Sequence, residues 1–398
     1  MTTYIKNFSI NENTKIINTF NDSQNVSWSI SGGEQNLFSI NPTTGVLSFK
    51  QSPDYEKPFN LNGTTLEFKT NYNTSNISSS FFVELYDTQN QTNQSTPITS
   101  DNFIQYVNDG SYENSLIHRV ESDFVIQSGA YKHPQVAEIP TLINTKGEIL
   151  NEPGNSNLPG TIAMAKVGGR PNSATSQWFI NLSNNQFLDS SNEGFTVFGH
   201  ILGDGIKNPL TISDVFKELS KDNPIAEDGY NVTYSNGLNL NQLPLYDFTS
   251  SKPWSGNIAY KDNYFAIDSI SSINQRPDEI SNKYNVIITS TNSAGEESNE
   301  YIIVEVKDVV ESDIIDKITR TISSEEQVYF GTSSNYTLYN LGEDRYALKT
   351  DSGYDEITGV TTLQFSDKSL NLEKDIAGTF DQVTGLNTDD AKMFRLYN

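Results

Sequence analysis

The 398-residue chain contains no cysteine. That absence excludes disulfide bonds, thiolate catalysis and cysteine-bound zinc. Histidine is scarce too, since the chain has only three, His118, His133 and His200. Positive charge is also sparse, with 26 Lys and Arg against 50 Asp and Glu and a formal net charge of −24. A surface of that sign repels phosphate backbones and anionic lipids, so nucleic acid and membrane surfaces are poor partner candidates.

Long hydrophobic runs are missing as well. No window approaches the roughly 20 apolar residues of a membrane-spanning helix, so membrane insertion is not expected. The opening "MTTYIKNFSINENTKI" lacks a basic segment followed by an apolar one. If the protein leaves the cell, we therefore expect a route other than a classical N-terminal signal.

What the chain does contain is a succession of short alternating apolar segments, such as "VSWSISG", "TLEFKTNY", "FFVELYD", "NVIITST" and "YIIVEVKD". Clusters of Asn, Ser, Thr, Gly and Asp separate them, a pattern typical of β-strands. Helical periodicity is confined to "SDNFIQYVNDG", with Ser100 or Asp101 as its cap, and to "TISDVFKELSKD". The length favours two to four domains. We expect a mainly β protein with minor helix.

One group of segments resembles a known family when taken in order. "IHRV" and "DFVIQSG" are followed by "GTIAMA", "NSATSQWFI", "FLD" and "VFG". From roughly Leu66 to Phe198 these segments resemble the cyclophilin-type peptidyl-prolyl cis-trans isomerases. The resemblance implies a closed β-barrel with two short helices that isomerises X-Pro bonds of peptides or proteins without a cofactor.

The resemblance also implies roles for individual residues. Arg119 would be the catalytic residue, with His118 beside it at the groove rim and Gln127 orienting it. Substrate would be bound by a further set: Phe124, Val125, Ala165, Lys166, Gln177, Phe179, Leu188 and Phe195. Isomerisation transfers no proton, so His118 is expected to form a wall rather than act as a base. By alternation Phe124 faces away from Val125 and Gln127, so it must reach the pocket from a strand end, which periodicity alone does not predict.

Four positions depart from the family pattern. Ser128 stands where glycine is usual, Val125 where methionine is common, Trp178 where phenylalanine is usual and Phe195 where many members have histidine or tyrosine. Each change keeps the site apolar or small. Specificity is therefore more affected than activity.

Segments on either side resemble parts of a cadherin-like repeat. "NLFSINPTTGVLSFKQSPDYEKP" resembles its middle and "YNVIITSTNSAGEESNEYIIVEVKD" its closing hairpin. We therefore predict that the isomerase is inserted into a β-sandwich, with two incomplete sandwiches in tandem as the alternative. An inserted domain from near Asn62 to near Asn282 should fold alone, because both cuts fall in polar linkers. Calcium is possible in the cadherin-like part, through Glu12, Asp54, Glu56 and Asp308.

The remaining segment, from roughly Ser312, resembles the Asp- and Gly-rich β segments of large bacterial secreted and surface proteins. It suggests an extracellular or cell-surface location, leaves a cytoplasmic one open, and suggests neighbouring domains of a longer chain past Asn398. The expected organisation has four parts: residues 1–60, first part of the sandwich; 61–280, isomerase; 281–311, closing hairpin; and 312–398, β-rich tail. The architecture is a cyclophilin-like barrel joined to a cadherin-like β-sandwich and a small β-rich C-terminal region.

Two functions compete. The first is a working prolyl isomerase on a β-rich extracellular scaffold. The second is an adhesive or structural module whose cyclophilin-like part binds peptides without significant activity. A hydrolase using His118 lacks an accompanying nucleophile motif.

Overall fold

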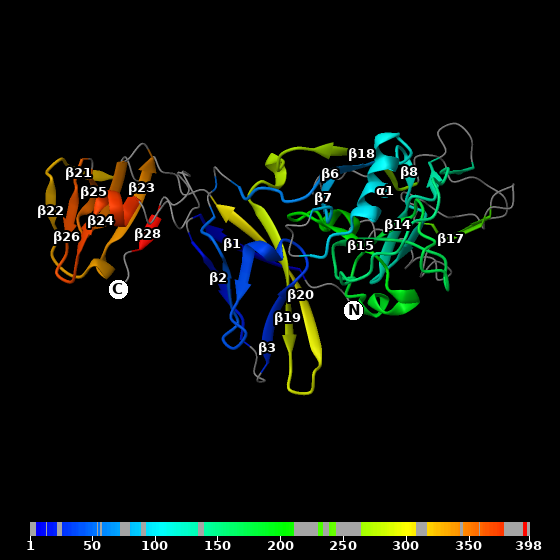
Figure 1. The fold of residues 1–398 in the computed structure, drawn as a ribbon, viewed down its shortest axis with the longest axis horizontal. Coiled ribbons are helices and arrows are strands. Elements are labelled where there is room, and N and C mark those ends of the chain that lie inside the picture. Colours follow the sequence, from blue (N-terminus) through cyan, green and yellow to red (C-terminus); the bar gives the residue numbers. More distant parts are fainter. Residues whose placement is uncertain are drawn as a thin grey trace, which may run out of the picture. The chain divides into compact units, whose positions relative to one another are not determined.

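A computed structural model describes residues 5–12, 14–21, 26–53, 55, 58–71, 80–88, 93–133, 139–210, 230–233, 239–243, 264–307, 317–342, 345–357, 359–377 and 393–395. Its described part is mainly β, as expected, and Figure 1 shows its strands and the α-helix α1. The chain divides into two compact units, residues 1–7, 22–36 and 60–303 in the first and 8–21, 37–59 and 304–398 in the second. No helix of the described residues is long and apolar enough to cross a membrane.

The first unit contains a 13-stranded sheet. Its strands are β6 (Thr65–Thr70), β7 (Ser80–Leu85), β8 (Ser115–Leu116), β9 (Arg119–Glu121), β10 (Val125–Ser128), β11 (Tyr131–Lys132), β12 (Thr141–Leu142), β13 (Thr161–Met164), β14 (Trp178–Asn181), β15 (Val197–Ile201), β16 (Tyr230–Thr233), β17 (Asn239–Leu243) and β18 (Ala266–Ile273). Their order is β12-β11-β8-β18-β6-β7-β15-β13-β14-β10-β9-β17-β16. Among the described strands no pairing joins β12 to β16, the two ends of this order, so they form a curled half-barrel in place of the expected closed barrel.

Helix α1 (Pro97–Asn108) begins three residues before the expected cap at Ser100. Proline fits the first turn because its missing N–H would have no partner there. The carboxylate of Glu152 accepts hydrogen bonds from the backbone N–H of Ile98 at 3.2 Å and of Thr99 at 2.8 Å. A distant side chain therefore caps this helix, which local sequence could not indicate. The other expected helix, "TISDVFKELSKD", lies outside the described residues.

A second sheet has four strands in the order β1-β20-β19-β3. They are β1 (Ile5–Asn11), β3 (Ser27–Ser31), β19 (Lys283–Thr291) and β20 (Glu297–Lys307). Residues 287–291 of β19 pair antiparallel with β3. A strand from the first sixty residues thus pairs with one that follows the isomerase-like segment, which is the pairing that an inserted isomerase requires.

The core of the first unit does not stop at the expected domain boundary. Ile287, Tyr301 and Ile303 belong to the same buried cluster as Ile162 and Phe198. The side-chain amide of Asn285 also donates to the backbone oxygens of Ile201 and Gly203, each at 2.9 Å. A fragment from 62 to 282 would lose these contacts. The expectation that both cuts lie outside its core is therefore wrong.

The second unit contains three smaller sheets. The strands of the first are β2 (Ile16–Thr19), β4 (Phe38–Ile40) and β5 (Val46–Phe49); of the second, β21 (Ile318–Ile322), β23 (Thr337–Gly342), β24 (Arg345–Thr350), β25 (Gly353–Ile357) and β28 (Met393–Arg395); of the third, β22 (Glu326–Val328), β26 (Thr362–Gln364) and β27 (Ser369–Asn371). Buried residues such as Leu338, Leu348 and Leu363 form a separate core in the C-terminal part.

A buried ion pair joins the segment after β18 to the segment after β3. The Arg276 guanidinium donates to both carboxylate oxygens of Glu34, at 2.6 and 3.2 Å, and both side chains are 5% exposed. The Glu34 carboxylate also accepts the backbone N–H of Asn285 at 3.0 Å. Each charge is therefore neutralised and hydrogen-bonded away from water, as buried ions must be.

Replacing Glu34 with glutamine should lower the free energy of unfolding by about 3–5 kcal/mol, because it leaves the Arg276 charge buried and unpaired. Urea denaturation measures this. Lys6→Gln breaks the exposed pair with Glu300 and is the control, with an expected cost of at most about 1 kcal/mol. Equal effects of the two substitutions would contradict this reading of the buried pair.

Candidate functional site

The candidate site begins with the short hairpin of β9 and β10. The two strands pair antiparallel, with Gln127 opposite Arg119 and Val125 opposite Glu121. Val120, between Arg119 and Glu121, is fully buried. Because side chains alternate along a strand, Arg119, Glu121, Gln127 and Val125 share the opposite face.

Three groups hold the guanidinium of Arg119. Its Nη2 donates to Oε1 of Glu121 at 2.6 Å, and its Nη1 donates to Oε1 of Gln127 at 3.2 Å. The ring of Phe124 lies 5.6 Å from the guanidinium carbon, within the range of a cation–π contact. The side chain is 32% exposed. The cation is thus fixed in direction while part of it stays open to solvent.

A chain of amides extends from Arg119 to the next strands. The Nε2 of Gln127 donates to Oε1 of Gln177 at 2.9 Å. The backbone oxygen of Gln177 accepts the N–H of Ala165, also at 2.9 Å. These bonds therefore bring Gln177 and Ala165, two of the residues predicted to bind substrate, side by side near Gln127.

Next to the guanidinium lies an apolar cluster separate from the main core. Its buried members are Tyr86, Val125, Ala163, Phe179, Leu188 and Val197, with the partly buried Phe124, Ala165 and Phe195 packed against them. Phe179 and Phe195 meet edge to face with ring centroids 5.9 Å apart. Six of the predicted substrate-binding residues thus come together here, although they come from different elements.

Phe124 reaches this cluster because it lies outside β10. It follows Asp123, whose φ of 62° is the left-handed conformation that aspartate tolerates better than most residues. The backbone oxygen of Phe124 accepts the N–H of Leu182 and the side-chain amide of Asn185, both at 2.9 Å. Two hydrogen bonds from residues that follow β14 therefore fix the turn that positions the Phe124 ring.

Lys166 follows Ala165 and contacts the loop that carries Phe195. Its ammonium donates to the backbone oxygens of Asn192 at 2.9 Å and Gly194 at 2.5 Å. It also lies 5.0 Å from the ring centre of Phe195. Burial lowers the pKa of Lys166 from its usual value. The amine therefore braces the loop that carries Phe195.

His118 forms a wall beside Arg119. Its Nδ1 is out of contact with solvent, and its ring meets that of Tyr131 edge to face at 5.5 Å. Burial, together with the nearby charge of Arg119, lowers the pKa of His118 to about 4. The imidazole is therefore neutral at pH 7, which fits a wall.

Comparison with known proteins assigns this site to a family. Residues 88–229 match the sequence model of the cyclophilin type peptidyl-prolyl cis-trans isomerase/CLD family. A peptidyl-prolyl cis-trans isomerase of Acinetobacter baylyi is 38% identical over 144 residues, which are 36% of this chain and 68% of that protein. Peptidyl-prolyl cis-trans isomerase B of Escherichia coli is 35% identical over 124 residues, 31% of this chain and 73% of that protein.

The chain belongs to the cyclophilin-type peptidyl-prolyl cis-trans isomerases. The matched segment contains Arg119 and every member of the apolar cluster except Tyr86. A solved cyclophilin-type isomerase of Cryptosporidium parvum aligns over 54% of this chain and 100% of its own, with 18% identity and a TM-score of 0.33. That likeness is too low to add to the sequence relationship.

Two departures from the cyclophilin pattern have a structural explanation. The hydroxyl of Ser128 is buried and meets the Ser115 hydroxyl at 2.8 Å and the backbone oxygen of Leu116 at 2.9 Å. Trp178 is 1% exposed and packs edge to face on Phe68, at 5.5 Å between ring centroids. Both side chains therefore pack in the interior of the half-barrel, and neither belongs to the apolar cluster.

Sequence reasoning missed two neighbours of the site. Glu121 pairs with Arg119, and its position two residues along an alternating strand was the signal that could have found it. Phe187, in the 3₁₀ turn Gln186–Asp189, stacks on Phe124 at 5.7 Å and is 59% exposed. No local pattern marks Phe187, because the contact joins residues more than sixty positions apart.

Of the four predicted calcium ligands, only Glu12 lies among the described residues. It is 1% exposed, and its carboxylate accepts the backbone N–H of Tyr55 at 3.0 Å. Asp54, Glu56 and Asp308 lie outside the described residues. Within the described part no group of three or more His, Cys, Asp or Glu could hold a metal. Calcium stays a prediction.

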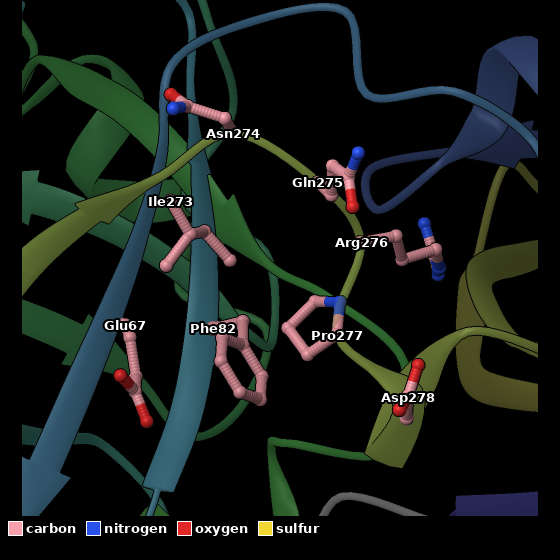
Figure 2. Close-up of a pocket in the computed structure, with 8 residues that line it drawn as sticks. All are labelled: Glu67, Phe82, Ile273, Asn274, Gln275, Arg276, Pro277 and Asp278. Atoms are coloured by element: carbon pink, nitrogen blue, oxygen red, sulfur yellow. The ribbon is translucent and has the colours of Figure 1, made fainter.

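A cavity of about 610 Å³ lies elsewhere in the first unit, beside β6, β7 and the segment after β18 (Figure 2). Its lining includes Glu67, Phe82, Ile273, Arg276, Pro277 and Asp278. Arg276 is already bound by Glu34, and none of the predicted catalytic or substrate-binding residues lines this cavity. This cavity is therefore distinct from the candidate active site.

His118 should make stability depend on pH below neutrality. Its pKa is about 4 in the folded chain and near 6.5 when unfolded, so between these values the unfolded chain binds the extra proton. The free energy of unfolding should then fall as the pH drops through this window. Between pH 7 and 5, urea denaturation should show a loss up to about 2 kcal/mol larger for the wild type than for His118→Gln. Identical pH dependence in both proteins would contradict a neutral folded-state imidazole.

Proposed function

We propose that Arg119 stabilises the twisted amide during isomerisation of X-Pro bonds in peptides or proteins. Amide resonance sets a barrier of ~18–20 kcal/mol against rotation about the C–N bond. Rotation removes the resonance and makes the prolyl nitrogen a better hydrogen-bond acceptor. A donor aimed at that nitrogen therefore stabilises the transition state more than the planar ground state.

The observation that carries this proposal is the held guanidinium of Arg119 at the edge of an apolar cluster. Glu121 and Gln127 fix the end of the cation, so it does not reorganise as the amide twists. Phe179, Leu188 and Phe195 offer an apolar wall of the size and character that a proline ring requires. Such a site needs neither a nucleophile nor a metal.

The neighbouring residues have supporting roles in this proposal. Gln127 orients Arg119 and, with Gln177, offers amide groups to the peptide backbone. Ala165 and Lys166 line the groove beyond the proline pocket, with Lys166 bracing the Phe195 loop. His118, which is neutral at pH 7, forms a wall beside Arg119 and exchanges no proton with the substrate. The proposed partners are proline-containing peptides or proteins.

The insertion of the cyclophilin segment into a β-sandwich is part of the same proposal. The pairing of β19 with β3 across the whole isomerase segment supports it. A cadherin-like identity for the flanking strands, an extracellular location and neighbouring domains beyond the tail rest on sequence resemblance. The alternative, a peptide-binding module without significant activity, predicts peptide affinity with no acceleration.

Arg119→Ala should abolish most isomerase activity while leaving the fold intact, because the side chain is partly exposed and acts mainly in the transition state. We expect a fall in kcat/KM of about 100-fold or more, the typical cost of losing one transition-state donor. A protease-coupled assay on an X-Pro peptide measures it, with circular dichroism as the folding control.

Arg119→Lys should fail as well, since a single ammonium does not reproduce the planar fork that Glu121 and Gln127 hold. Wild-type rates in Arg119→Ala would refute the mechanism. No acceleration by the wild type would favour the binding-module alternative.

A further inference from the structure

Glu121 is the one carboxylate within the described residues that is bonded to the guanidinium of Arg119. Both side chains point to the same face of β9, since the buried Val120 separates them. Across the hairpin, Val125 of the apolar cluster lies opposite Glu121. The carboxylate therefore lies on the same face of the hairpin as Arg119 and Val125, beside the apolar cluster.

The contact is more specific than a surface ion pair. Arg119 is 32% exposed and Glu121 27% exposed, and their N···O distance is 2.6 Å. Two different nitrogens of one planar group are bound by acceptors from two strands, Glu121 on β9 and Gln127 on β10. Two anchors fix the plane of a guanidinium, whereas one anchor leaves it free to rotate about a single hydrogen bond.

Exposed ion pairs contribute little to stability, so we expect the Glu121 carboxylate to add little to the stability of the fold. Its effect on the cation is larger, because an arginine side chain otherwise samples many rotamers and must be ordered during each turnover. We propose that Glu121 is a positioning residue for catalysis, which holds the Arg119 fork in its working orientation before substrate arrives. This inference rests on the proposed role of Arg119.

A carboxylate beside a catalytic cation has two opposing effects. It fixes the orientation of the cation, and it partly neutralises its charge. Orientation dominates in this geometry, because Nη2 is held by Glu121 and Nη1 by Gln127, while the Nε–H has no bond to either anchor. If neutralisation dominated instead, removal of the carboxylate would speed the reaction.

The test compares Glu121→Ala with Glu121→Gln. Alanine removes one of the two anchors, while Gln127 still holds Nη1. A full misplacement of about 1 Å costs on the order of 100-fold, so with one anchor left we expect kcat/KM to fall about tenfold. The loss should appear in kcat with KM nearly unchanged, because orientation acts in the transition state. Glutamine keeps an oxygen that accepts from Nη2, so Glu121→Gln should retain activity within about threefold of the wild type.

Glu300→Ala is the matched control. It removes a 28% exposed carboxylate that pairs with Lys6 at 2.7 Å, on a different sheet, and should leave kcat/KM unchanged. Circular dichroism and urea denaturation confirm that each variant is folded. If Glu121→Ala were to unfold, the comparison of Glu121→Gln with the wild type would still decide the case, since a loss much larger than threefold contradicts the retained anchor.

A double variant separates this inference from the proposed function. If Glu121 acts through Arg119, adding Glu121→Ala to Arg119→Ala should cause no further loss. An inactive Arg119→Ala combined with a fully active or faster Glu121→Ala would overturn the positioning role alone. An active Arg119→Ala would instead overturn the proposed function on which it rests.

Discussion

The antiparallel pairing of β9 with β10 is the interaction on which the candidate site depends. This pairing places Gln127 opposite Arg119 and Val125 opposite Glu121. A shift by one residue would turn every one of these side chains to the other face. The register therefore determines, at once, which groups hold the guanidinium and which apolar side chain stands beside it.

The surrounding structure keeps that hairpin in place. On one side, β10 pairs with β14, where Gln127 lies opposite Phe179 of the apolar cluster. At the turn, Leu182 and Asn185 bind the backbone of Phe124. Farther away, β19 and β20 contribute Ile287, Tyr301 and Ile303 to the same core as the cyclophilin strands. The flanking strands therefore complete the scaffold that holds the site, rather than merely surrounding it.

Much of the site was accessible from sequence because its residues lie in short ordered motifs. The resemblance carried by "IHRV" and "DFVIQSG" pointed to Arg119, Phe124 and Gln127, which the structure brings into contact. Alternation alone did not predict the position of Phe124, which lies just before β10. Glu121 was within reach of the same alternation. Its contact depends on the side-chain direction of Arg119, which a pattern of apolar residues does not specify.

Features that depend on distant contacts were harder to predict. The half-barrel replaces the expected closed barrel, because closure depends on pairing between strands far apart in the chain. Helix α1 starts at Pro97 because the carboxylate of Glu152, more than fifty residues later, accepts hydrogen bonds from N–H groups of the first helical turn. The extension of the core past residue 282 was missed for the same reason. Alternation in "NVIITST" shows that a strand has a buried face, and does not show which core that face joins.

The most direct test of the account is exchange spectroscopy by nuclear magnetic resonance on an Ala-Pro peptide mixed with a catalytic amount of the protein. A catalyst that binds the twisted amide through Arg119 accelerates cis–trans exchange and leaves the equilibrium ratio unchanged. We predict fast exchange with the wild-type protein and exchange near the uncatalysed rate with Arg119→Lys. Line broadening from peptide binding without faster exchange, or equal exchange rates with both proteins, would contradict the account.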